Sequence, residues 1–121
     1  MKVLYQYRIT ERSADGLKAE VLVDEDSPVY RGHFPSSPVT PGVFQLQMII
    51  DVLQDHLGTR LILSSARSIK FTSPHVPDGG QILEVDIKIR PGAENRVGIN
   101  ATLSGTGKTY LKFRGEFSRI Q

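Results

Sequence analysis

Cysteine is absent from the 121-residue sequence, and so is any long apolar run. Without cysteine the chain can form no disulfide, use no catalytic thiolate and build no cysteine-based zinc site. Because no stretch of about 18 apolar residues occurs, no segment is expected to span a bilayer. The N-terminus turns polar by Arg8 and offers no signal-peptide core. These absences predict a cytoplasmic protein with no membrane attachment.

A strong net charge is also lacking, because 15 Lys and Arg against 13 Asp and Glu leave only +2. The charges are unevenly spread: residues 1–60 carry 6 basic and 8 acidic side chains, whereas residues 61–121 carry 9 and 5. A basic second half favours encounter with an acidic partner. The basic residues are scattered singly and no aromatic stacking motif accompanies them, so we expect no nucleic-acid binding.

Two further signals carry no site of their own. His33, His56 and His75 have no metal-ligand spacing with one another or with carboxylates, so no metal is predicted. His75 can reach the mouth of a site around His33 from its proline-flanked loop, but we expect it to pack within that loop or to lie at the surface. Residues 104–109 resemble a phosphate-binding loop, but Thr102 stands where that motif needs glycine and no helix follows. They predict a hairpin turn.

The apolar pattern predicts one α+β domain over residues 1–121. Strands are expected over 4–11, 17–24, 61–72, 81–90, 97–104 and 108–117. A helix is expected over 42–57, with Gly58 as the residue that terminates it. The helix carries an apolar stripe of Val43, Leu46, Ile50, Leu53 and Leu57, and further apolar residues around it. It is therefore expected to be buried in the middle of the domain.

A curved antiparallel sheet wrapped around one central helix satisfies this order of elements. Such a sheet leaves one edge and one end of its helix poorly covered. We therefore expect two copies to pair edge to edge as a homodimer, or as a larger assembly of such dimers.

The segment ahead of the helix holds the chemistry. His33 lies in a loop stiffened by four prolines, and the helix begins at about Gly42. A helix N-terminus offers unpaired N–H groups that polarise a carbonyl oxygen, and histidine is a base that titrates near neutral pH. A base beside a carbonyl polariser is what proton abstraction next to a thioester requires.

Residues 32–43 match the signature G-H-F-P-x-x-P-x-x-P-G-V without a gap. This signature resembles that of the 3-hydroxyacyl-acyl carrier protein dehydratases of the FabZ and FabA kind, which have the hotdog fold. Residues 68–78 are similar to a second segment of that family, of the form K-F-x-x-P-V-x-P-G. The resemblance covers roughly residues 5 to 117.

The resemblance implies a hydro-lyase that interconverts (3R)-3-hydroxyacyl and trans-2-enoyl thioesters in fatty acid or related lipid or polyene biosynthesis. His33 would be the catalytic histidine, and the Gly42 N–H would hold the thioester carbonyl. Pro41, Val43 and Phe34 would contact the substrate.

The resemblance also implies a site shared between two subunits, with the histidine from one chain and a carboxylate from the other chain's helix. The substrate's phosphopantetheine arm, carried by an acyl carrier protein, would enter past a basic rim, and no further cofactor is implied. The candidates for this rim are Arg31, Arg60, Arg67 and Lys70.

One position departs from the family pattern. Fourteen residues after His33 the family has Glu or Asp, and here that residue is Gln47. An amide can orient the leaving hydroxyl but cannot protonate it. His33 can serve both proton transfers, or Asp51, four residues later on the same helix face, can substitute as the acid.

The missing carboxylate leaves two other functions open. The chain can be a non-catalytic subunit that pairs with an active dehydratase paralogue. A hotdog thioesterase ranks lower, because that chemistry also needs a carboxylate to activate water.

Overall fold

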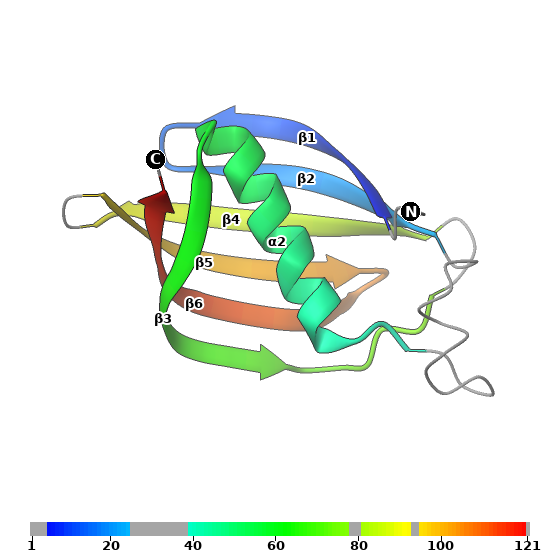
Figure 1. Ribbon diagram of the computed structural model, residues 1–121. Helices are drawn as coiled ribbons and strands as arrows, with labels where there is room; N and C mark the ends of the chain where they lie inside the picture. The colour runs from blue at the N-terminus through cyan, green and yellow to red at the C-terminus, as the bar shows by residue number, and fades with distance from the viewer. Residues whose placement is uncertain (1–4, 25–38, 78–80, 93–94, 121) are drawn as a thin grey trace.

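A computed structural model describes residues 5–24, 39–77, 81–92 and 95–120. The described strands form one antiparallel sheet in the order β1-β2-β4-β5-β6-β3, and helix α2 lies across its concave face (Figure 1). The elements are β1 (Tyr5–Ser13), β2 (Gly16–Val23), α2 (Gly42–Leu57), β3 (Arg60–Phe71), β4 (Ile82–Pro91), β5 (Arg96–Gly105) and β6 (Lys108–Ile120). The predicted α+β hotdog architecture is confirmed.

Two tight hairpins set the register of the sheet. At the β1–β2 turn, a Cβ on Gly16 would lie 2.3 Å from the Ile87 carbonyl oxygen, so only glycine allows β2 to approach β4 this closely. At the β5–β6 turn, Thr106 and Gly107 both have positive φ, of 49° and 76°. Positive φ at both central residues matches the twist of the flanking strands. The segment 104–109 is therefore the predicted hairpin turn.

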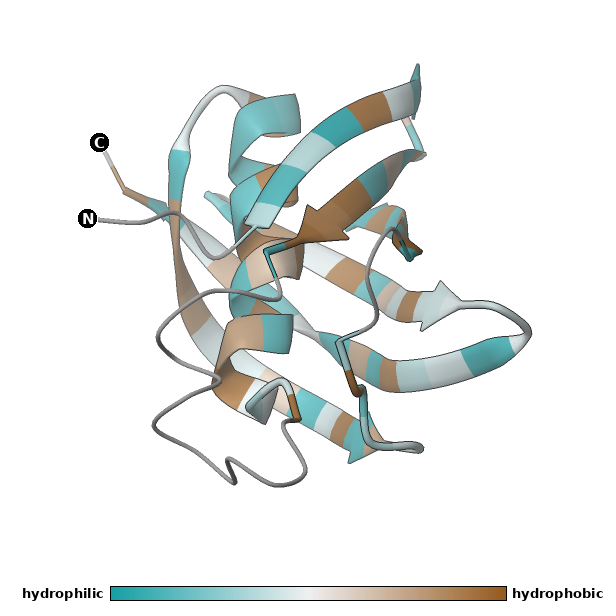
Figure 2. Cartoon of the chain, turned by 90° about the vertical axis from the view of Figure 1, so that its right-hand side faces the viewer, coloured by the Kyte–Doolittle hydropathy of each residue, from teal (hydrophilic) through white to brown (hydrophobic). Residues whose placement is uncertain are grey.

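The core lies between α2 and the concave face of the sheet. Apolar and polar residues alternate along the strands, as Figure 2 shows, so that each strand buries one face. The buried members from β4 and β5 are Leu83, Val85, Ile87, Val97, Ile99, Ala101 and Leu103. These inward positions follow the sequence pattern.

The helix is buried over most of its length, as predicted. Its buried residues are Gln45, Met48, Ile49, Val52 and Leu53, and Leu46, Ile50 and Leu57 of the predicted stripe are partly buried against the core. Val43, the first residue of that stripe, is the exception at 70% exposure. The curved sheet therefore covers most of the apolar surface of the helix and leaves Val43 open.

The two edges of the sheet have different surfaces. β1 exposes mainly polar and charged residues, such as Arg8, Thr10, Glu11 and Arg12. β3 exposes Ile62, Leu63, Ile69 and Phe71. Charged side chains protect an edge from further pairing, and apolar ones do not. Among the described helices, none is long and apolar enough to cross a membrane.

Candidate active site

The described part of the signature begins at residue 39 and leads directly into α2. Pro41 is the N-cap, with φ −57° and ψ 144°, and no side chain caps the helix. The Pro41 carbonyl accepts from the N–H groups of Phe44 and Gln45, at 3.0 and 3.2 Å. The first-turn N–H groups of Gly42 and Val43 have no acceptor within the helix. They are the groups that can receive a carbonyl oxygen.

Gly42 is set against an aromatic ring. A Cβ at this position would lie 2.5 Å from Cζ of Phe71, at the end of β3, so a larger residue here would push the ring aside. Phe71 is half-exposed. The Phe71 ring therefore forms one wall beside the helix N-terminus. The exposed Val43 is the residue after Gly42 in the chain.

Gln47 and Asp51 are held together on the polar face of α2. Gln47 Nε2 donates to Asp51 Oδ1 at 2.7 Å, and the Tyr5 hydroxyl of β1 donates to Asp51 Oδ2. Both carboxylate oxygens of Asp51 thus accept a hydrogen bond from their own chain. The Gln47 amide is fixed through its nitrogen, which leaves its carbonyl oxygen and its second N–H available to a ligand.

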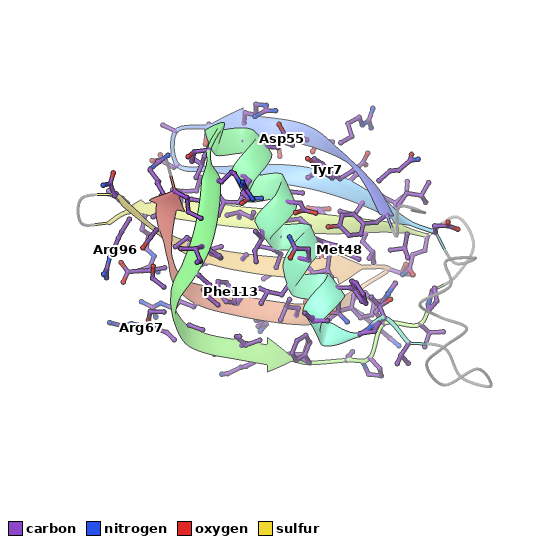
Figure 3. All side chains as sticks on the ribbon, viewed as in Figure 1. Tyr7, Met48, Asp55, Arg67, Arg96 and Phe113 are labelled. Carbon is purple, nitrogen blue, oxygen red and sulfur yellow. The ribbon has the colours of Figure 1, made fainter. Side chains whose placement is uncertain are left out.

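A second tyrosine–aspartate pair lies one turn further along the helix. The Tyr7 hydroxyl donates to Asp55 Oδ2 at 3.0 Å, and Figure 3 labels Tyr7 by the strands and Asp55 at the end of α2. Burial raises the pKa of Tyr5 and of Tyr7, and the hydrogen bonds to Asp51 and Asp55 raise these pKa values further. Both phenols therefore stay protonated at neutral pH and act as donors that tie α2 to β1.

Three of the predicted site residues lie outside the described residues: His33, Phe34 and Arg31. Their roles stay predictions. The described rim candidates all lie on β3, but at different ends of it. Arg60 lines a hollow of about 440 Å³ with Asp51 and Asp55, near the end of α2. Lys70 lines a different hollow with Lys88, Lys112 and Arg114.

These positions do not gather the cations into one rim within a single chain. The Phe71 ring faces Gly42 at the start of α2. Because successive side chains of a strand point to opposite faces, the side chain of Lys70 lies on the face away from the helix. Arg67, near the middle of β3, is exposed. Whether these cations receive a carrier protein stays a prediction.

Sequence reasoning missed a buried polar cluster around His75. The imidazole is 1% exposed and contacts Thr40 Oγ1 through Nδ1 at 2.6 Å and Gln81 Oε1 through Nε2 at 3.3 Å. Its ring packs edge-on against Tyr110. The predicted loop-packing role is correct and the predicted surface position is wrong. A signal was present, because position 75 falls on the valine of K-F-x-x-P-V-x-P-G.

The buried imidazole predicts a loss of stability in acid. Burial lowers the pKa of His75 below its ordinary 6.5, and Tyr110 is the titratable side chain packed against it. The unfolded chain therefore binds this proton more readily than the folded chain. The stabilisation is fully present above pH 6.5 and is lost as the pH falls towards the lowered pKa.

Urea unfolding at pH 7.5 and pH 5.5 checks this expectation. The free energy of unfolding of the wild type should fall more between these conditions than that of His75→Asn, which does not titrate. His33 and His56 are common to both proteins, so they cancel in the comparison. An equal fall in the two proteins would contradict the prediction.

Comparisons with known proteins agree with this geometry. A family model described as ApeI dehydratase matches residues 9–114. A FabZ 3-hydroxyacyl-[acyl-carrier-protein] dehydratase of Fusobacterium nucleatum is 26% identical over 106 residues, which are 84% of this chain and 70% of that protein. The FabZ of Ruminiclostridium cellulolyticum is 24% identical over 90 residues, 69% of this chain. The match spans 63% of that relative, less than two thirds of its length.

Solved structures share the fold. The dehydratase heterocomplex ApeI:P of Xenorhabdus doucetiae contains a chain that superposes with a TM-score of 0.73 at 23% identity, covering 98% of this chain and 100% of that one. A hypothetical thioesterase of Streptococcus pneumoniae with coenzyme A gives 0.73 at 10% identity, covering 95% and 86%. The fold alone does not separate the two activities. The family model spans almost the whole sequence, and this chain belongs to the ApeI dehydratase family.

Proposed function

We propose that the protein dehydrates (3R)-3-hydroxyacyl thioesters of an acyl carrier protein to trans-2-enoyl thioesters. The substrate loses its α-proton and its β-hydroxyl, which leave together as water. Membership of the dehydratase family supports the reaction class. The observation that carries the proposal is the uncapped start of α2 at Gly42, walled by Phe71 and followed by the Gln47–Asp51 pair.

In the proposed mechanism the thioester carbonyl accepts a hydrogen bond from the Gly42 N–H. Negative charge develops on that oxygen as the α-proton leaves, so a donor placed there stabilises the transition state. The His33 imidazole takes the α-proton and then returns it to the departing β-hydroxyl. The hydroxyl is held by Gln47, whose amide hydrogen-bonds but transfers no proton.

Asp51 is assigned the role of positioning Gln47. Both of its carboxylate oxygens already accept hydrogen bonds, one from Gln47 and one from Tyr5. A carboxyl group that protonated the substrate would have to turn one oxygen away from these donors. We therefore favour His33 as the proton donor and Asp51 as the anchor of the amide.

Asp51→Asn separates these two roles. The asparagine Oδ1 still accepts the Gln47 N–H, so the loss in kcat should stay within about fivefold, the scale of one weakened hydrogen bond. If Asp51 were the general acid, kcat would fall by about 10²–10⁴. Asp55→Asn, on the same helix face and also bonded to a tyrosine, serves as the matched control and should keep full turnover.

We further propose that the working unit is a homodimer paired through β3, so that His33 of one copy meets Gln47 of the other. The apolar β3 edge and the exposed Val43 support this arrangement, because both offer apolar surface that one chain leaves uncovered. The Xenorhabdus dehydratase, which is a heterocomplex, supports a second candidate for this chain, a subunit that completes the site of a paralogue.

A further inference from the structure

His75 occupies a buried position from which it contacts the residue that precedes the helix cap. Thr40 is 4% exposed and meets His75 twice. Its N–H donates to the His75 carbonyl at 2.8 Å, and its hydroxyl lies 2.6 Å from Nδ1. The Thr40 carbonyl accepts from Gln45 Nε2 at 3.1 Å, which ties the same residue to the first turns of α2.

The hydrogen-bond network favours one tautomer of the imidazole. The Tyr110 hydroxyl donates to the Gly105 carbonyl and therefore accepts from Gln81 Nε2. This orientation presents Gln81 Oε1 to His75, and a carbonyl oxygen can only accept. The His75 proton accordingly resides on Nε2. Nδ1 is the acceptor, and the Thr40 hydroxyl donates to it.

We propose that His75 is a positioning residue that fixes, through Thr40, the direction of the Gly42 N–H toward the substrate carbonyl. This role rests on the proposed dehydratase function. Thr40 is held at its N–H, its hydroxyl and its carbonyl, and Pro41, whose ring restricts φ, is the sole residue between it and Gly42. The Pro41 carbonyl lies in the same peptide plane as the Gly42 N–H and accepts from Phe44 and Gln45, so this plane moves with the first turn of the helix. Removing the imidazole takes away one of the contacts that hold Thr40 and lets this first turn rotate slightly.

A transition-state contact is sensitive to such rotation. A misplacement of about 1 Å can cost on the order of 10²-fold in rate. Substrate binding draws on the whole acyl chain and its carrier, so it should change little. The signature expected of His75 is therefore a fall in kcat with an unchanged KM.

A double-mutant cycle between His75→Val and Thr40→Val tests the proposal. Each variant should lower kcat by about tenfold with KM within about twofold, and the double variant should be no slower than either, because both remove one interaction. Thr40→Ser, which keeps the hydroxyl, and His75→Asn, which keeps an acceptor, should retain most of the activity. Additive losses, or equal losses in Thr40→Ser and Thr40→Val, would overturn it.

Ile99→Ala supplies the control for a merely structural effect. Ile99 is fully buried in the core on β5, and its aliphatic side chain has no polar atom that could join the hydrogen bonds around His75. We expect it to lower the melting temperature as His75→Val does while leaving kcat unchanged. A parallel loss of kcat in Ile99→Ala would assign His75 to stability alone.

A readout without substrate keeps the inference separate from the proposed activity. ¹⁵N NMR of the imidazole should show a proton on Nε2 and an unprotonated Nδ1, and the Gly42 amide resonance should shift in Thr40→Val and in His75→Val alike. If these signals appear and no 3-hydroxyacyl thioester is turned over, the dehydratase proposal fails, whereas the contact by which His75 positions Gly42 through Thr40 is upheld. If turnover is found and the tautomer is reversed, the positioning role of His75 fails.

Discussion

Replacing Gln47 by glutamate is expected to raise kcat for dehydration by about 10²-fold, because a positioned general acid typically contributes 10²–10⁴. Gln47 is exposed and already bonded to Asp51 at 2.7 Å, so glutamate places a second carboxyl group beside the first. Two carboxylates within this distance repel, which raises the pKa of one of them. The pair would retain a proton near neutral pH and could give it to the leaving hydroxyl.

Gln47→Met is the control, since it keeps the length of the side chain and removes its hydrogen bonds. Its kcat should fall by about tenfold, the cost of losing one hydrogen bond to the hydroxyl. If the Gln47→Glu variant is no faster than the wild type, the β-hydroxyl of the substrate does not lie beside the side chain of residue 47. If the wild type has no dehydratase activity and the Gln47→Glu variant is active, the result would instead support the second candidate function, a subunit that completes the active site of a paralogue.

Two lysines on β3, Leu63→Lys with Ile69→Lys, are expected to separate the proposed homodimer into monomers. Both side chains are partly exposed in the single chain, so the fold should tolerate the change. Across a two-fold axis each new charge repels its symmetry-related copies, and lysine is a known protector of sheet edges. The mass by light scattering should fall from twice 13.4 kDa to 13.4 kDa.

Turnover should fall with the dimer, by about 10³-fold or more, because a base and the hydroxyl-binding group on different chains lose their proximity. The matched control adds two lysines to the other edge, Gln6→Lys with Thr10→Lys on β1. That variant should remain dimeric and active. A monomeric β3 variant with full turnover would place the whole site within one chain.

Local signals in the sequence predicted most of the fold. Helix α2 begins at Gly42 and ends at Leu57 as predicted, because Pro41 and Gly58 mark its two ends chemically. The alternation in β4 and β5 also identified their buried faces. Most of the predicted helix stripe is also buried or partly buried against the core, and Val43 is the exception. Apolar residues surround α2 on most sides, so only the position of the sheet decides which of them are fully buried.

The candidate site was predictable only in part, for a similar reason. The signature and the spacing from His33 pointed to Gly42 and Gln47 as candidates, and their roles stay predictions. The links from Tyr5 to Asp51 and from Thr40 to His75 join residues 46 and 35 positions apart. Such contacts depend on strand order and on the path of the loop after β3, which spacing does not encode.

The most direct test is mass spectrometry of 3-hydroxyacyl carrier protein substrates of short and medium chain length, with the purified wild type and with His33→Ala. We expect the wild type to remove one water from the 3-hydroxyacyl substrate and to add it back when the enoyl thioester is supplied, and we expect no reaction with His33→Ala. A folded wild-type dimer that dehydrates none of these substrates, or a His33→Ala variant that dehydrates them at the same rate, would contradict it.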